Sequence, residues 1–259
     1  MPSLQISPIL SGIHSAYLEN TLGLDINGTR LLLYARTLGV NFAQTATIGR
    51  QGMHLSANDL AKNLGHFGFD QPEKLAGEAL KDFFAEHFLR LLGAERVDSF
   101  DASPYENAAY VHDMNLPIRD EFKGRYTAVL DGGSLEHVFN YPTSIKNCME
   151  MTAIGGHFIA ITPTNNFMGH GFYQFSPELF FSVFTEENGF DTPRVILFED
   201  RPDAAWREVP NPKALGRRVT LCNETPTYLF VMSRRVRTAD VFATTPQQSD
   251  YVAAWGTKT

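Results

Sequence analysis

"YTAVLDGGSLEHVFNYPTSIKNCMEMTAIGGHFIAITP", residues 126–163, holds two apolar stretches on either side of a run with helical spacing. YTAVLDGGS (126–134) predicts a strand that ends in a Gly-rich turn, and GGHFIAITP (155–163) predicts a second strand. PTSIKNCMEMT (142–152) predicts the helix between them. A strand–helix–strand unit of this kind indicates parallel strands in an α/β sheet.

The same alternation of strands and helices continues on both sides of this stretch. Residues 1–40 predict an N-terminal helical cap, because SAYLENTLG (15–23) and GTRLLLYARTLG (28–39) have apolar spacing close to 3.6, and residues 41–259 form the α/β domain. The two strands nearest the C-terminus are separated only by ETP, so we expect them to pair antiparallel. Further strands are expected over 41–49, 96–103, 108–115, 194–200, 218–223 and 227–236, and helices over 56–68, 72–93 and 176–189.

Composition excludes several classes of protein. The chain has 259 residues, 43% of them hydrophobic, and a net charge of −7, which is unlike the basic surface of a nucleic-acid binder. Cys148 and Cys222 lie far apart without a CxxC motif, so we predict no zinc knuckle and no redox dithiol. The sequence contains no signal peptide pattern and no apolar window of membrane-spanning length. We therefore expect a cytoplasmic protein that binds neither nucleic acid nor a membrane.

Polar residues follow each predicted strand of the parallel part. In such sheets ligands bind beyond the carboxyl ends of the strands, so these residues are the candidates for a site. In chain order, the strand ends are IGRQG (48–52), DAS (101–103), HDMN (112–115), DGGSLEH (131–137) and TPTNN (162–166).

Three segments in this order, VDSFDAS (97–103), AYVHDMNLPI (109–118) and the quoted stretch 126–163, resemble the core of class I S-adenosylmethionine (SAM) dependent methyltransferases. The resemblance spans roughly residues 44–236. It implies a Rossmann-like, seven-stranded, mostly parallel sheet with an antiparallel terminal strand and helices on both faces. It also implies SAM as the cofactor and methyl transfer as the activity.

The resemblance assigns cofactor roles to named residues. It implies that Asp101, with Ala102 beside it, accepts hydrogen bonds from the ribose hydroxyls. It implies that Asp113 binds the adenine amino group and that Met114 contacts the ring. Asp131, Gly132 and Gly133 are implied to lie near the methionine part and the transferred methyl. Taken singly, each of these segments is also an ordinary turn or cap signal.

Two departures from the family pattern leave alternatives open. The first loop carries only Gly49 and Gly52, so Gln51 and Arg50 are candidates to contact the methionine ammonium and carboxylate, or else Arg50 points to solvent. The link PYEN (104–107) is too short for the helix expected there. Tyr105 is a candidate to cover the adenine or ribose, and Glu106 is an alternative to Asp101 as the ribose ligand.

The acceptor side of the site is predicted around two histidines. His170 or His137 is the candidate general base, with Glu136 orienting one of them, although Glu136 and His137 could instead cap the next helix. The loop 164–177 mixes amides and aromatics, which suits a small polar or sugar acceptor or else a self-packed Ω-loop.

We predict no metal ligands, with Mg²⁺ held by Asp131 and Asn165 or Asn166 as a minor variant. The leading function is methyl transfer to a hydroxyl or amine of a small metabolite or saccharide, and dimerisation is left open. The alternative is a catalytically inactive protein of the same fold that acts as a binding or regulatory partner. A nicotinamide dehydrogenase is disfavoured because G-x-G-x-x-G is absent.

Overall fold

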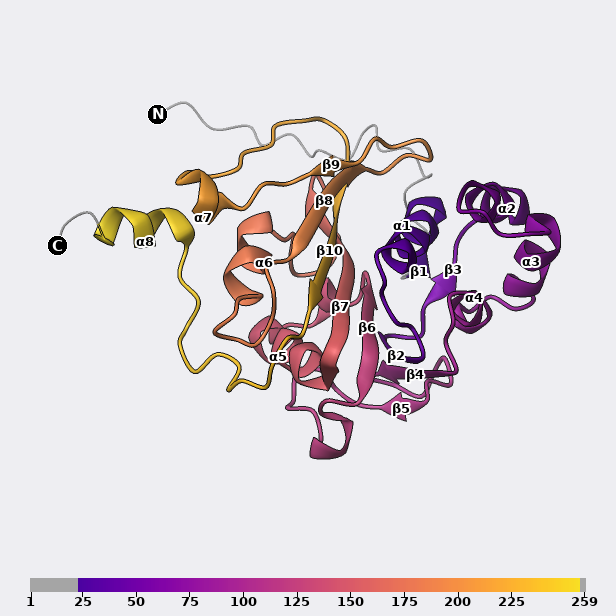
Figure 1. Cartoon of the computed structure of the whole chain (residues 1–259), viewed down its shortest axis with the longest axis horizontal. Coiled ribbons are helices and arrows are strands. Elements are labelled where there is room, and N and C mark those ends of the chain that lie inside the picture. Colours follow the sequence, from indigo (N-terminus) through magenta and orange to yellow (C-terminus); the bar gives the residue numbers. More distant parts are fainter. Residues whose placement is uncertain (1–22, 257–259) are drawn as a thin grey trace, which may run out of the picture.

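A twisted eight-stranded sheet runs through the centre of the computed structural model, which describes residues 23–256 (Figure 1). The strands lie side by side in the order β5-β4-β2-β6-β7-β10-β8-β9. The first five are mutually parallel, whereas β10 runs antiparallel to both β7 and β8. The strands are β2 (Gln44–Ile48), β4 (Arg96–Asp101), β5 (Tyr110–Val111), β6 (Tyr126–Gly132), β7 (Thr152–Asn165), β8 (Arg194–Glu199), β9 (Arg207–Glu208) and β10 (Thr227–Arg234).

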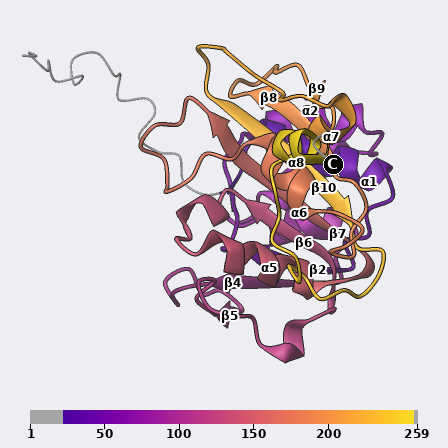
Figure 2. The same ribbon diagram turned by 90° about the vertical axis from the view of Figure 1, so that its left-hand side faces the viewer.

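Helices cover both faces of this sheet, as the two views show (Figures 1 and 2). A two-stranded parallel pair, β1 (Gly23–Leu24) with β3 (Gly52–Met53), lies beside α1. The helices are α1 (Ile26–Thr37), α2 (Ala57–His66), α3 (Pro72–Ala79), α4 (Glu86–Leu91), η2 (Asp120–Phe122), η3 (Leu135–His137), α5 (Tyr141–Met151), α6 (Pro177–Val183), α7 (Pro212–Leu215) and α8 (Ser249–Gly256).

Alternation along the central strands decides which helices pack where. In β7, Phe158 and Ala160 belong to the core shared with α5 and α6, whereas Ile159 and Ile161 belong to the core shared with α1 to α4. Successive side chains of a strand point to opposite faces, so a strand buried on both sides is apolar almost throughout. The two layers of helices are thus a direct consequence of the continuous apolar runs in the sequence.

The strand order changes direction between β2 and β6. From β2 the chain adds β4 and β5 on one side, and it then crosses back to add β6 and β7 on the other side. At such a switch point the loops that follow the two strands separate and leave a crevice for a ligand. The loops after Ile48 and Gly132 therefore flank the expected ligand position.

The predicted α/β class, with its mostly parallel sheet and helices on both faces, is confirmed. Seven of the eight strands expected from the sequence are present, which is the number that the resemblance implies, and β9 adds a two-residue eighth strand at the edge. The expected helix 72–93 is instead two helices, α3 and α4. The segment between the two helices forms backbone hydrogen bonds with the loop after β2. Met53 N donates to Phe83 O at 2.7 Å, and Ala85 N donates to Gln51 O at 2.9 Å.

The strand expected over 218–223 was wrong, because this segment has no regular structure. β10 pairs antiparallel with two strands, β8 on one side and β7 on the other. The strand expected over 108–115 shrinks to Tyr110–Val111, because Asp113 closes a turn directly after it. The apolar character of a short segment does not determine whether it pairs with a neighbouring strand.

The predicted N-terminal cap is only partly within the described residues. The helix expected over 15–23 falls on residues 1–22 and lies outside them. The second expected helix corresponds to α1, which begins at the N-cap Asp25, whose carboxylate accepts from Gly28 N at 2.6 Å. Over residues 23–256, every helix is too short or too polar to cross a membrane.

Tyr126→Phe tests the buried polar contact at the start of β6. The Tyr126 hydroxyl donates to the buried carboxylate of Asp98 at 2.9 Å, so the substitution removes a charge-assisted hydrogen bond. We expect the free energy of unfolding, measured with a denaturant, to fall by about 1–3 kcal/mol. Tyr105→Phe is the control because the side chain of Tyr105 is exposed, and an equal loss in both variants would contradict this account.

Candidate functional site

The loop after β2 is held tightly against the loop after β6. Gly49 has φ +70°, and its N–H donates to Phe100 O at 2.7 Å. A Cβ at Gly49 would lie 2.8 Å from Ser134 Oγ, so no side chain fits there without a shift. Ser134 Oγ donates to Ile48 O at 2.7 Å and so ties the two loops together. Glycine at position 49 is thus needed for both its backbone angle and the close approach.

Gln51 is buried at the switch point rather than exposed on the loop. Its Nε2 donates to Ile48 O at 2.6 Å and to Ser134 Oγ at 3.3 Å. Its Oε1 is buried and has no hydrogen-bond partner in the structure. The Gln51 amide lies against Gly132, where any Cβ would overlap Oε1. An acceptor without a donor in a buried position is costly, and it marks a place where a ligand donor would be stabilised.

Arg50 is held by protein groups through Nε and Nη1. Its Nε donates to Glu86 Oε1 at 2.7 Å, and Nη1 donates to the carbonyl oxygen of Glu106 at 2.9 Å. The guanidinium also stacks 3.8 Å from the ring centroid of Phe84. The sequence-based alternative in which Arg50 points to solvent is therefore wrong. For Arg50 to bind a ligand carboxylate, the pair with Glu86 would first have to open.

Asp131 lies at the end of β6 with its carboxylate turned inward. Oδ1 accepts from Ser134 N at 2.9 Å and from Leu135 N at 3.2 Å, which shapes the Gly-rich turn. Gly133 adopts φ +91° in this turn. Burial raises the pKa of Asp131 well above its ordinary range, and the nearby charge of Glu136 raises it further. Two carboxyl groups thus share a dry region at the switch point.

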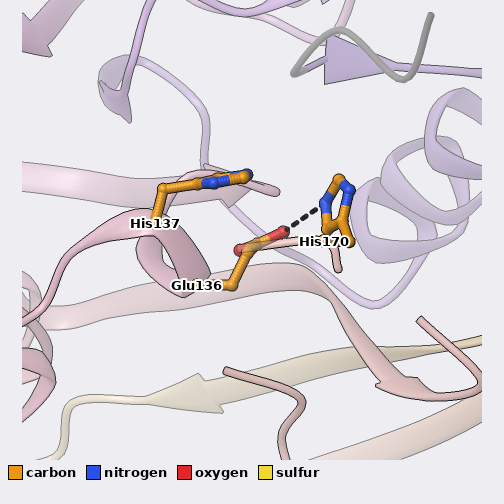
Figure 3. A group of neighbouring side chains, drawn as sticks. All are labelled: Glu136, His137 and His170. Atoms are coloured by element: carbon orange, nitrogen blue, oxygen red, sulfur yellow. Dashed lines mark ion pairs between the residues drawn. The ribbon is translucent and has the colours of Figure 1, made fainter. Parts of the chain in front are cut away.

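Glu136, His137 and His170 come together as a cluster (Figure 3). His170 Nε2 lies 3.5 Å from Glu136 Oε1, and the rings of His137 and His170 are 5.0 Å apart between centroids. Glu136 is fully buried, whereas His137 is exposed and His170 is partly exposed. Burial lowers the pKa of His137, and the Glu136 carboxylate only partly offsets this. The three residues expected to act on the acceptor are therefore neighbours in space.

The loop that carries His170 is fixed to η3 by its own backbone. Phe172 N donates to Glu136 O at 2.8 Å, and a Cβ at Gly171 would lie only 2.8 Å from that same carbonyl oxygen. The base of the loop is closed by Phe175 N, which donates to Pro163 O at 2.8 Å. The loop is therefore self-packed, as the Ω-loop alternative expected, and it still presents His170 to Glu136.

The ends of β4 and β5 are more open. Asp101 accepts from Ser103 N at 2.9 Å in a turn, and Ala102 beside it is exposed. Asp113 is exposed, and its Oδ1 accepts from Asn115 N at 2.9 Å, which lowers its pKa. Met114 is 4% exposed and packs in the core with residues of α5, so its expected contact with an adenine ring stays a prediction. A single apolar residue after a strand can turn to either side, and this one turns inward.

The side chains expected to share a Mg²⁺ ion with Asp131 are committed elsewhere. Asn165 Nδ2 and Asn166 Nδ2 both donate to Asn223 Oδ1, at 2.8 and 3.0 Å. The sequence reading did not single out Ser134 as the tie between the two loops. Its place after Asp-Gly-Gly marks only a turn, and its partner Ile48 lies 86 residues earlier.

Two exposed aromatics form a pair, of which Phe172 belongs to the aromatic loop expected on the acceptor side, whereas Phe139 was missed. Phe139 and Phe172 are 72% and 65% exposed, and their ring centroids are 5.6 Å apart. Tyr173 Oη donates to Phe139 O at 2.6 Å and holds the two segments together. Large exposed aromatics beside polar groups are typical of surfaces that receive a ligand.

Comparison with known proteins gives structural likeness only. No protein-family model matches the sequence, and no curated protein sequence matches it. A 1,6-didemethyltoxoflavin-N1-methyltransferase from Burkholderia thailandensis, solved with S-adenosylhomocysteine, is 15% identical with a TM-score of 0.42, over 82% of this chain and 78% of that one. A suggested sarcosine dimethylglycine methyltransferase from Galdieria sulphuraria is 13% identical with a TM-score of 0.47, over 81% and 86%. A branched-chain polyamine synthase from Thermus thermophilus is 14% identical with a TM-score of 0.40, over 86% and 60%. At these values the fold assignment depends on the strand order itself.

Gly171→Ala tests how the loop is fixed to η3. Gly171 has φ +68° and no room for a Cβ beside Glu136 O. We expect the free energy of unfolding to fall by more than the about 1–3 kcal/mol that the backbone angle alone costs. Gly169→Ala is a matched control, because Gly169 has φ +89° with open space around it. Equal losses in the two variants would mean that the backbone angle alone, and not the contact with η3, is responsible.

Asp131→Asn tests the buried carboxyl, since it keeps an oxygen for the two backbone donors. Above the ordinary pKa of 3.8, the unfolded chain loses a proton that folded Asp131 keeps, so the stability of the wild type falls as the pH rises towards the folded pKa. The loss is up to about 1.4 kcal/mol per pH unit. We expect Asp131→Asn to gain unfolding free energy relative to the wild type over this window, measured by denaturant unfolding at several pH values. Asp203→Asn is the control, because Asp203 is exposed. Parallel pH profiles of the wild type and Asp131→Asn would contradict the raised pKa of Asp131.

Proposed function

We propose that this chain is a SAM-dependent methyltransferase that acts on a small-molecule or sugar acceptor. One observation carries the proposal: buried oxygens without hydrogen-bond partners gather at the switch point of the parallel sheet, on Gln51 Oε1 and on both carboxylate oxygens of Glu136. Ligands of doubly wound sheets bind at this place. SAM is the cofactor that the resemblance of residues 44–236 implies.

The cofactor half of the proposed site lies at the ends of β2, β4 and β6. The methionine ammonium of SAM is a donor that would satisfy Gln51 Oε1, whose amide lies against Gly132. Asp101 is the preferred ribose ligand. Glu106 stays the alternative, because its carbonyl oxygen is already fixed by Arg50 and its side chain lies on the same short link. Asp113 is exposed, with Oδ1 held by Asn115, and is the proposed partner of the adenine amino group.

The acceptor half is the cluster of Glu136, His137 and His170 with the aromatic pair beside it. Methyl transfer moves a methyl cation equivalent from the sulfonium sulfur to an acceptor oxygen or nitrogen, leaves a neutral thioether and releases the acceptor's proton. In the metal-free chain, His170 paired with Glu136, or else His137, takes that proton. Phe139 and Phe172 would stack on the flat face of a ring or sugar.

One observation favours the second candidate, an inactive protein of the same fold that serves as a binding partner. Arg50 forms an ion pair with Glu86, and the Gln51 amide donates hydrogen bonds to Ile48 O and Ser134 Oγ. If these contacts do not open, the loop after β2 cannot receive the methionine part of SAM. Direct measurement of SAM binding separates the two functions.

Calorimetric titration of the purified chain with SAM and S-adenosylhomocysteine tests the proposal. We expect saturable binding, and we expect Gln51→Ala to weaken it about 10–100-fold, which is the value of a hydrogen bond to a charged group. Gln247→Ala is the matched control, because Gln247 is exposed and far along the chain. Absence of binding at millimolar SAM would favour the partner function, and unchanged affinity in Gln51→Ala would remove Gln51 from the site.

A further inference from the structure

The cluster of Glu136, His137 and His170 has the donors and the spacing of a metal centre. One ligand atom from each residue, two imidazole nitrogens and one carboxylate oxygen, lies within 4.8 Å of the other two (Figure 3). Two imidazoles with one carboxylate are a set that suits Zn²⁺ and its neighbours, whereas Mg²⁺ and Ca²⁺ prefer oxygen ligands alone. The composition of the cluster therefore indicates a transition metal rather than Mg²⁺.

The burial of Glu136 and the lack of hydrogen bonds to its carboxylate are independent evidence for a cation site. The residue is fully buried, yet neither carboxylate oxygen has a hydrogen-bond partner in the structure. Among residues 23–256, the ion pair of this carboxylate is with His170, whose Nε2 lies 3.5 Å from Oε1. Buried carboxylates are almost always hydrogen-bonded, paired or bound to a metal. A cation between Glu136 and the two imidazoles would supply what the protein itself does not.

The backbone holds the three ligands in place before any ion binds. Glu136 and His137 are consecutive residues of η3, so their positions are fixed together. His170 comes from a loop that is fixed by the bond from Phe172 N to Glu136 O, and Gly171 permits the close contact. A pre-arranged set of ligands binds a metal with less loss of conformational entropy than a flexible one.

The cluster is open on one side. Glu136 forms its buried floor, His137 is exposed, and the side chain of His170 is 21% exposed. Three protein ligands with an open position are typical of catalytic zinc sites, in which water or substrate completes the coordination. The acceptor is proposed to bind at this open side.

We propose that Glu136, His137 and His170 bind a divalent transition metal of the Zn²⁺ class, with one coordination position open to the acceptor side. This goes beyond methyl transfer and does not depend on it. If both hold, the bound ion rather than a free imidazole lowers the pKa of an acceptor hydroxyl, because a metal acts as a Lewis acid on a bound oxygen. The sequence alone gave no metal site, because His137 and His170 are 33 residues apart with no spacing motif.

Metal titration of the full-length chain tests the proposal without SAM or acceptor. The protein, with any affinity tag removed, is stripped with a chelator and dialysed, then titrated with Zn²⁺ by calorimetry and with Co²⁺ by visible absorption. We expect one ion per chain and the intense bands of four- or five-coordinate Co²⁺, which Zn²⁺ then displaces. His137→Ala and His170→Ala should each weaken binding by at least about 100-fold, the upper end of the loss seen when only an outer-shell partner is removed. Glu136→Gln should also weaken metal binding.

The control variant is His66→Ala, because His66 is an exposed histidine at the end of α2. It should bind the metal as the wild type does. His137 is exposed, so His137→Ala is expected to fold, and circular dichroism of every variant checks this. Absence of a Co²⁺ spectrum, or unchanged affinity in folded His137→Ala, would overturn the proposal. SAM binding by the stripped protein is measured separately, so failure of the metal site and failure of the methyltransferase proposal remain distinguishable.

Discussion

Two side chains converge on one carbonyl oxygen at the end of β2, and the rest of the candidate site depends on this contact. Gln51 Nε2 and Ser134 Oγ both donate to Ile48 O, at 2.6 and 2.7 Å. A carbonyl at the end of a strand would otherwise be left for water. Here it joins the loops that follow β2 and β6, which are parallel neighbours on the two sides of the switch point. Because the two loops are tied, the positions of Asp131, Glu136 and their neighbours follow from the sheet itself.

The second constraint is electrostatic. Asp131 and Glu136 place two carboxyl groups in a buried region, and the pKa of Asp131 is raised by burial and by the charge of Glu136. Asp131 has two backbone donors, whereas Glu136 has no hydrogen-bond partner in the structure. A region of this kind favours any positive charge that enters it, whether a metal ion, a sulfonium or a protonated imidazole. The asymmetry between the two acids shows where that charge is needed, since it is Glu136 that lacks a partner.

The sequence predicts the central sheet and its two layers of helices better than it predicts the contacts between loops. The apolar runs of β6 and β7 indicate strands buried on both faces, because every second residue must meet a different layer of helices. The grouping of Glu136 with His170 also follows from the order of strand ends, since both follow neighbouring parallel strands. By contrast, the pairing of Arg50 with Glu86 joins residues 36 positions apart through a helix break that no local signal marks. The strand expected over 218–223 fails for a related reason, because apolar character alone does not determine which strand a segment pairs with.

The unusual loop IGRQG can be understood from the residues that face it. Gln51 is 2% exposed, so its side chain needs space inside the protein. Gly132 supplies that space, since a Cβ there would overlap Gln51 Oε1, and Gly49 leaves room for Ser134 in the same way. The side chain missing at position 132 and the one present at position 51 are therefore complementary. Gln51 is thus built into the switch point as a fixed polar group, held by Ile48 O and Ser134 Oγ.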